Sequence, residues 1–331
     1  MRRRNETLKN ETMIFNLNTQ NTMRHILVLA VAASFPIAAF AGTATISTAE
    51  NGKGAQPVTC ETDPLDTIMV TTDYGFHQDL KRGDGNLEVE HNNIEINRRI
   101  PINLFTWPNM QCGQWFLRLG ADYERFDFSI HDEDRLPNTL QSAAGLIALE
   151  YRVNDETGIL IESRPGVYFE HKATTGAFDI PTNVAAAIPI RDGKLYVIAG
   201  ATYSGLDRYP VFPIGGILWH INPKWDLRGY LPDPRLVYMV SDNLEFYAGG
   251  ELVGGAYKTD SRTITPQKIS GGPLTYEEAR AGAGVTWKAK PLTLDFAAGY
   301  TVQSSFDYSR AGESWGTHPA PYVRLMARLD F

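Results

Sequence analysis

The sequence is poor in the features that mark helical membrane proteins and proteins that bind metals or nucleic acids. Its one long apolar run, residues 26–41, spans about 16 residues and includes Pro36, so it falls short of the ~20 that a bilayer-spanning helix needs. No later segment could form a membrane helix. The two cysteines and seven histidines show no metal-ligand spacing, and the net charge of −7 argues against a nucleic-acid partner. We therefore predict no metal, no cofactor and no nucleic-acid partner.

The apolar run fits a targeting signal. It follows a basic start at Arg24 and His25 and ends in the sequence Ala-Phe-Ala at residues 39–41. This pattern is typical of a secretory signal peptide that is cleaved after Ala41, with an uncleaved membrane anchor as the alternative. Met23 is the favoured start, because the stretch before it is polar. The predicted organisation is an N-terminal extension and cleaved signal peptide over 1–41, a periplasmic segment over 42–65 and one domain over 66–331.

From about Leu65 onward, apolar and polar residues alternate in segments separated by turn-forming residues, which is the signature of β-strands. The clearest segment, Leu292 to Gln303, has apolar residues at its even positions up to Val302. Only a closed barrel could carry such strands across a membrane, because every backbone polar group in lipid needs an internal partner. From Leu140 onward, short turns and longer polar loops mostly alternate, as they do in outer-membrane barrels. The sequence therefore predicts an all-β protein, a closed antiparallel transmembrane β-barrel.

The predicted number of strands is fourteen, with twelve as the fallback. An even number places both termini on the periplasmic side of the outer membrane. The weak point is Pro232-Asp233-Pro234, read as a tight outer turn, because it leaves two strands shorter than the ~9–11 residues that a span needs. The strands are expected near 66–80, 87–104, 114–130, 142–152, 157–171, 182–191, 194–206, 210–221, 225–231, 235–241, 243–256, 275–287, 291–304 and 319–331.

Two of these segments change the parity of their apolar residues. Apolar positions are odd-numbered at Leu87 and Val89 but even-numbered from Ile94 onward. A second change falls between Tyr123 and Phe126. We interpret the first change as a β-bulge at Asn92-Asn93, which would keep the apolar residues on one face, and we interpret the second change as another β-bulge.

Five of the six tryptophans lie at or beside predicted periplasmic turns. Indole favours the headgroup level of a membrane, where its ring is half apolar and its N–H stays hydrated. We favour an aromatic girdle over the alternative, the core of a soluble sandwich, because such a core would not collect tryptophans at one end of its strands. The predicted girdle consists of Trp107, Trp115, Trp219, Trp225 and Trp287.

The last ten residues, 322–331, alternate apolar and polar positions and end in Phe331. This segment resembles the closing strand of Gram-negative outer-membrane proteins. The resemblance implies that the barrel-assembly machinery recognises it, with Phe331 as the assembly signal, and that outer-membrane lipid and lipopolysaccharide surround the barrel. Residues 219–238 also resemble an uncharacterised family of predicted outer-membrane barrels, which carries no established activity.

No catalytic constellation stands out in the sequence. Barrel enzymes that act on lipid or lipopolysaccharide need a nucleophile or an activated water beside a base. His77, His131, His171 and His318 fall near predicted outer rims or loops, but none lies in the His-x-Ser-Asn-Gly setting of outer-membrane phospholipases. We therefore predict that the protein is not an enzyme.

Charged residues of both signs fall at predicted inward positions. They could form a packed polar network that keeps the wall rigid, or line a wet pore and tune its selectivity. We favour the pore, because a barrel of ~12–14 strands has room for water and residues 42–64 are too few for a substantial plug. The candidate lumen charges are Arg118, Asp122, Glu162, Arg164, Glu251, Glu278, Arg280, Asp295, Arg324 and Arg328, and Glu170 also falls at an inward position.

Cys60 and Cys112 are both predicted on the periplasmic side. In that oxidising compartment a cysteine pair usually forms a disulfide, so we favour a disulfide over two free thiols. The function that the sequence indicates best is a porin-like passive channel or a transport protein for small solutes. The alternatives are a barrel enzyme acting on lipid or lipopolysaccharide and a closed structural or adhesive barrel.

Overall fold

The computed structural model describes residues 66–83, 85–102, 104, 113–153, 157–191, 194–264 and 266–331. Trp107, Cys60 and Cys112 lie outside the described residues, as does the predicted signal peptide, so the signal peptide and the disulfide stay predictions. Among the described residues, no helix has the length and apolar character needed to span a membrane.

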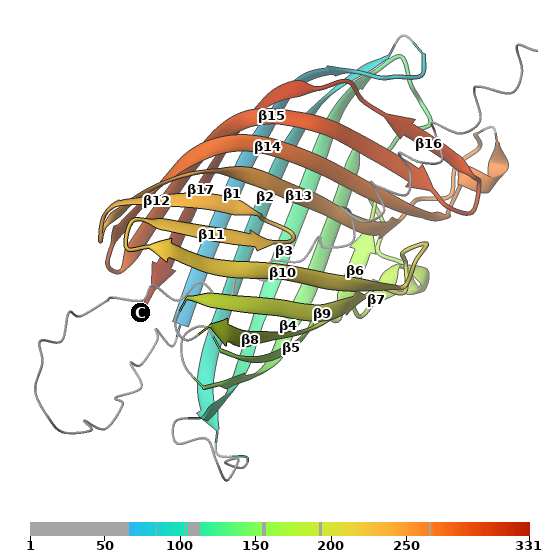
Figure 1. Cartoon of the computed structure of the whole chain (residues 1–331). Coiled ribbons are helices and arrows are strands. Elements are labelled where there is room, and N and C mark those ends of the chain that lie inside the picture. The colour runs from blue at the N-terminus through green and yellow to red at the C-terminus, as the bar shows by residue number, and fades with distance from the viewer. Residues whose placement is uncertain are drawn as a thin grey trace, which may run out of the picture.

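The described chain forms one closed antiparallel β-barrel of fourteen wall positions (Figure 1). This confirms the predicted fold and strand number. Three wall positions are each built from two pieces, β5 with β6, β7 with β8, and β16 with β17. The strands are β1 (Asp66–Asp79), β2 (Asn86–Ile102), β3 (Gln114–His131), β4 (Thr139–Arg152), β5 (Gly158–Ser163), β6 (Gly166–Phe169), β7 (Phe178–Asp179), β8 (Thr182–Arg191), β9 (Leu195–Tyr203), β10 (Val211–Asn222), β11 (Trp225–Tyr230), β12 (Arg235–Ser241), β13 (Leu244–Lys258), β14 (Pro273–Ala289), β15 (Leu292–Tyr308), β16 (Glu313–Gly316) and β17 (Ala320–Asp330).

The first and last strands close the ring. β1 pairs with β17 from Thr67 opposite Asp330 to Gly75 opposite Tyr322. Two backbone hydrogen bonds join Asp66 and Phe331, with N–O distances of 2.9 and 3.0 Å. We call this the terminal end of the barrel and the opposite end the far end. The tight turns between β10 and β11, β12 and β13, and β14 and β15 lie at the terminal end, and two short 3-10 helices, η2 (Thr175–Ala177) and η3 (Gln267–Ile269), lie in far-end loops.

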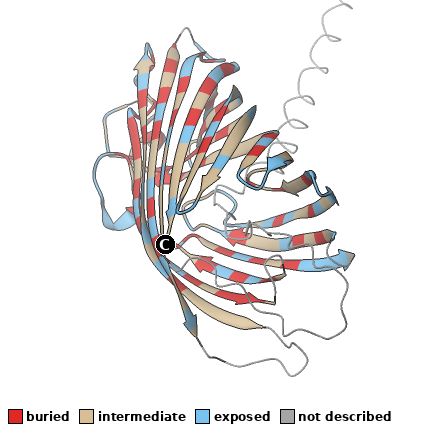
Figure 2. Ribbon diagram, turned by 90° about the vertical axis from the view of Figure 1, so that its left-hand side faces the viewer, coloured by how far each residue is buried: buried red, intermediate tan, exposed pale blue. Residues whose placement is uncertain are grey.

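Side chains alternate between the two faces of the wall, and the banding of buried and exposed residues follows each strand (Figure 2). On β15, Phe296 is 50% exposed and its neighbour Ala297 only 2%. Such a row of outward apolar side chains is unfavourable in water but matches the lipid-facing band of a membrane barrel. Other outward apolar residues are Val70, Ile94, Ile96, Leu119, Ile147, Ile159, Ile161, Val184, Ile188, Leu236, Phe246, Val302 and Leu325.

The two predicted bulges are wrong. β2 pairs with β3 in one unbroken register from Asn86 to Ile102, and β3 pairs with β4 without a shift. The parity of the apolar residues changes because the environment inside the barrel changes along its axis. Near the far end, Leu87 and Phe126 point inward into an apolar core, whereas nearer the terminal end Ile94 points outward. The register shift in this region lies in β1 instead, between Gly75 and Gln78.

Candidate functional site: the barrel interior and a seam in its wall

The predicted lumen charges do point into the barrel. Seven of the ten are buried in the described structure, and Asp122, Glu251 and Arg328 are partly exposed. Arg328 lies nearest the terminal end, where it donates a 2.7 Å hydrogen bond to Asp330. The buried seven are Arg118, Glu162, Arg164, Glu278, Arg280, Asp295 and Arg324.

The first group of charges lies on the inner faces of β2 to β5 and around Arg164, between β5 and β6. Arg164 bonds both Glu162 and Glu95, each at 2.9 Å, and lies 3.4 Å from Asp122. Arg118 bonds the other oxygen of Glu162. The three carboxylates are therefore held by the two guanidinium groups in one continuous network.

The second group joins β1, β2, β3 and β14. Arg280 is fully buried and donates to Asp73 at 2.6 Å and to Glu278 at 2.7 Å. Asp73 also bonds a ring nitrogen of His91 at 2.6 Å, and the other ring nitrogen lies 3.1 Å from Glu124. Both nitrogens of this buried histidine are therefore engaged by carboxylates, which leaves neither as a base for a substrate.

The third group lies under the turn between β11 and β12. Arg324 donates to Asp295 at 2.9 Å and to the hydroxyl of Tyr247 at 3.0 Å. Arg235 stacks over the Tyr247 ring with 4.1 Å between its guanidinium carbon and the ring centroid, and it bonds Asp233 at 2.5 Å. Glu251 pairs with Arg324 and approaches Arg280 to 3.9 Å, so it links the second and third groups.

These networks change the interpretation of the lumen charges. Each of the ten predicted residues has an oppositely charged partner, and buried charges are stable only when paired in this way. The arrangement resembles the packed polar network, the alternative that the sequence left open, more than a ring of hydrated charges around a wide pore. The sequence did not single out Asp73, His91, Glu95 and Glu124. The position of a polar residue on its own strand does not show which residues of other strands its side chain will contact.

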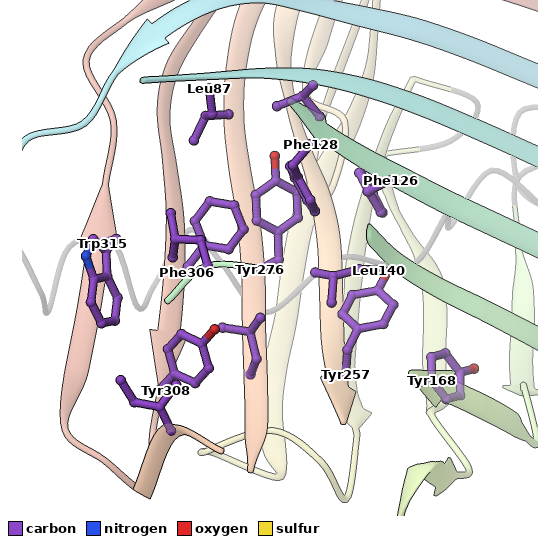
Figure 3. Close-up of a cluster of buried hydrophobic side chains, with 14 of the residues drawn as sticks. Leu87, Phe126, Phe128, Leu140, Tyr168, Tyr257, Tyr276, Phe306, Tyr308 and Trp315 are labelled. Atoms are coloured by element: carbon purple, nitrogen blue, oxygen red, sulfur yellow. The ribbon is translucent and has the colours of Figure 1, made fainter. Parts of the chain in front are cut away.

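An aromatic cluster fills the far end of the interior, and we call it the plug (Figure 3). Several of its ring pairs meet edge to face, with 5.1 Å between the centroids of Phe128 and Phe306 and 5.2 Å between those of Phe126 and Tyr276. The plug brings together side chains of β2, β3, β4 and β6 with those of β13 to β16. Its main members, each almost fully buried, are Leu87, Phe126, Phe128, Leu136, Leu140, Tyr168, Tyr257, Leu274, Tyr276, Phe306, Tyr308 and Trp315.

The loop between β3 and β4 covers the plug. Glu133 accepts a 3.2 Å hydrogen bond from the indole N–H of Trp315, and the Arg135 guanidinium lies over the same ring. Burial alone would raise the pKa of the Glu133 carboxyl, but the hydrogen bonds from Arg135 and Trp315 outweigh it and the pKa is lowered.

Trp315, the sixth tryptophan, packs beneath this loop and is not part of a girdle. Of the predicted girdle, Trp219, Trp225 and Trp287 face outward near terminal-end turns, and Trp115 is partly buried beside Tyr151.

Apolar residues gather on one side of the interior, which we call its apolar side. Ile214 of β10 packs there with Leu146 of β4 and Leu160 of β5. This apolar side adjoins the first charged group, because Ala148 lies between Arg118 and Glu162 in the paired strands. The apolar side comprises Leu146, Ala148, Leu160, Ala185, Ala187, Ile198, Ile214 and Leu218.

A gap in the hydrogen-bonded wall opens beside this apolar side, and we call it the seam. β11 and β12 end well short of their neighbours (Figure 1), as the turn at 232–234 predicted. In the described chain, β11 pairs with β10 only from Gly216 onward, and the turn bonds β13 only as far as Leu252. Residues 211–215 of β10 and 254–257 of β13 therefore face each other without a strand between them.

Beyond the seam the ring closes in a second way. Lys258 of β13 pairs in parallel with Phe169 of β6, and its carbonyl accepts a 3.1 Å hydrogen bond from the amide of Glu170. The far end is thus a smaller ring that leaves out β7 to β12, and the plug fills that smaller ring. The seam is the place where the two rings separate.

Two hollows lie along the seam. The narrower, about 50 Å³, is lined both by inward residues such as Tyr257 and Phe212 and by the outward Ala256 and Glu277, so it reaches through the wall. The wider, about 310 Å³, lies at the rim, and both hollows share Asp207.

One cluster has the residue types of a metal site, formed by Glu170, His171 and Asp260. However, Glu170 already accepts a hydrogen bond from the Asp260 amide at 2.8 Å, and the Arg262 guanidinium lies 3.1 Å from its carboxylate. A neighbouring guanidinium repels a cation, so this cluster is better explained as a loop anchor.

The fold is similar to those of several solved outer-membrane proteins. An outer-membrane channel from Pseudomonas putida F1 matches with 11% identity and a TM-score of 0.45, over 84% of this chain and 100% of that one. A FadL homologue from Pseudomonas aeruginosa matches with 12% identity and a TM-score of 0.32, over 83% and 94%. The translocator domain of the autotransporter NalP from Neisseria meningitidis matches with 12% identity and a TM-score of 0.33, over 82% and 90%. Neither a known protein family nor a curated protein sequence matches the chain.

Proposed function

We propose that the protein is an outer-membrane transport barrel for small solutes, with its terminal end in the periplasm and its far end outside the cell. The observation that carries the proposal is the seam. A barrel with a purely structural role is stabilised by pairing every strand edge, because unpaired backbone groups are costly in lipid. This wall instead leaves two edges unpaired beside a hollow that reaches the interior.

The packing of the interior favours a narrow route for solutes and not a wide, water-filled pore. The charges are paired, and the plug occupies the axial path at the far end. Solutes would therefore cross along the barrel axis only slowly, or only after the plug has moved. An enzymatic role gains no support from His91, whose two nitrogens are both bonded to carboxylates.

Planar-bilayer recording on the refolded mature protein tests the proposal, together with solute uptake by protein-containing liposomes. We expect single-channel conductance well below that of an open porin recorded in the same bilayer, and measurable uptake of small solutes. Absence of both conductance and uptake, for polar and apolar solutes alike, would favour the closed structural barrel instead.

A further inference from the structure

The wider hollow at the rim is lined by three cations and one carboxyl group. Arg208, Lys258 and Arg310 border it together with Asp207. Lys258 donates to the carbonyl of Gly271, and within residues 266–331 and the other described segments Arg310 has no ion-pair partner. The remaining cation, Arg208, lies 3.8 Å from Asp307, a long and exposed contact.

One carboxyl group, that of Asp207, borders the hollow together with these cations. Burial raises the pKa of the Asp207 carboxyl, an effect that outweighs the backbone hydrogen bonds from Tyr209 and Arg208. Like charges held around an unfilled space repel one another, and an anionic ligand would relieve that repulsion.

The seam beside this hollow is bordered by apolar residues on its β10 side and by Glu277 on its β14 side. The hollow meets the seam at Asp207, and the seam is bordered by Pro210 and Phe212. Val211, the first residue of β10, is 66% exposed on the outer face of the wall, and Tyr209 beside it is 53% exposed. Inside the seam lies the apolar side of the interior, beginning with Ile214.

We propose that the hollow and the seam together bind an anionic amphiphile, with its phosphate or carboxylate head on Arg208, Lys258 and Arg310 and its alkyl chain along the seam. This deepens the proposed transport function and rests on it, since it names the class of substrate and the route through the side wall. The narrower hollow, at about 50 Å³, admits only a few water-sized groups. An alkyl chain therefore enters by displacing the loop at residues 204–210, which carries Tyr209.

The head-group site is tested by equilibrium binding of dodecanoate to the full mature protein in neutral detergent, followed by native mass spectrometry. In the triple variant Arg208→Gln, Lys258→Gln, Arg310→Gln we expect the Kd to rise by about tenfold or more, because the charged partners of the head group are lost. The matched control is Lys172→Gln with Lys268→Gln, two exposed far-end loop cations that do not border the hollow. Equal losses in both proteins, or no loss in the triple variant, would overturn the proposal.

The chain-binding part is tested with Ala256→Trp, which fills the narrower hollow. We expect weaker dodecanoate binding, whereas inorganic phosphate binding at the rim stays unchanged. Ala256→Leu makes the same test with a smaller side chain, and a gel-mobility comparison of heated and unheated samples confirms that each variant is folded.

Two further probes separate the sources of the ligand. If lipid A added to the same detergent solution competes with dodecanoate, the resident outer-leaflet lipid shares the site, which supports the amphiphile class. If inorganic phosphate alone competes as well as dodecanoate, the site takes a free anion and the amphiphile proposal is wrong. All these measurements are made in detergent without transport, so a protein that binds dodecanoate but conducts and takes up nothing would refute the proposed function alone.

Discussion

The plug should respond to the loss of a single ring. Phe126 is fully buried at the centre of this cluster, and its ring stacks on His91 with 4.2 Å between centroids while meeting Tyr276 at its edge. Truncation of a buried phenylalanine to alanine costs about 3–5 kcal/mol where the site cannot collapse. The plug rings belong to separate hydrogen-bonded strands, which restricts such a collapse. We therefore expect Phe126→Ala to lower the free energy of unfolding by about 3–5 kcal/mol.

The matched control is Phe296→Ala, because this ring is 50% exposed on the outer face and lipid chains can fill the space it leaves. Denaturant midpoints of both variants, refolded into lipid vesicles, give the two stability losses, and bilayer recording gives the conductance. We expect Phe126→Ala to lose more stability than the control and to conduct more than the wild type. A loss no larger than that of Phe296→Ala, with unchanged conductance, would refute the view that packed rings close the far end.

Three further predictions concern the networks, the facing of the wall and the cysteines. Arg280→Leu should cost about 3–5 kcal/mol because it leaves buried carboxylates unpaired, whereas Lys290→Leu in a terminal-end turn should cost little; equal midpoints for the two variants would contradict the buried network. Phe296→Arg should cost about 2–4 kcal/mol in vesicles, since lipid cannot solvate the charge, and greater destabilisation by Ala297→Arg than by Phe296→Arg would reverse the facing of β15. Cys60 and Cys112 should resist alkylation in native membranes until a reductant is added, so ready labelling of both without reductant would exclude the disulfide.

The alternation of residues could predict the wall because it reports what each strand face contacts. On the segment from Leu292 to Gln303, outward positions contact lipid and inward positions contact the interior, so period two alone identifies the strand and its faces. The short strands β11 and β12 were predictable for a different reason. Pro232 and Pro234 each fix φ and lack a backbone N–H, and with Asp233 between them they favour a turn.

The interior could not be predicted in the same way, because its contacts join strands that are distant in the sequence. Arg280 and Asp73 are 207 positions apart, and only barrel closure brings them to 2.6 Å. The plug did leave a signal, namely the change of apolar parity at Leu87 and at Phe126. The interpretation as bulges assumes that apolar residues of a membrane barrel face lipid throughout. A parity change at one end of adjacent strands instead indicates an apolar interior at that end.

The closing pair of strands also sets the order in which the barrel can form. The hydroxyl of Thr67 donates a hydrogen bond to Asp330, a residue 263 positions further along the chain, so one side of the first strand stays without its partner until the last strand has been made. Closing so long a loop has a large entropic cost that is recovered only at the final step. Until then, the free edge of β1 is a template on which another chain could pair. Protection of that edge between synthesis and closure is thus a requirement built into the topology, whatever the finished barrel transports.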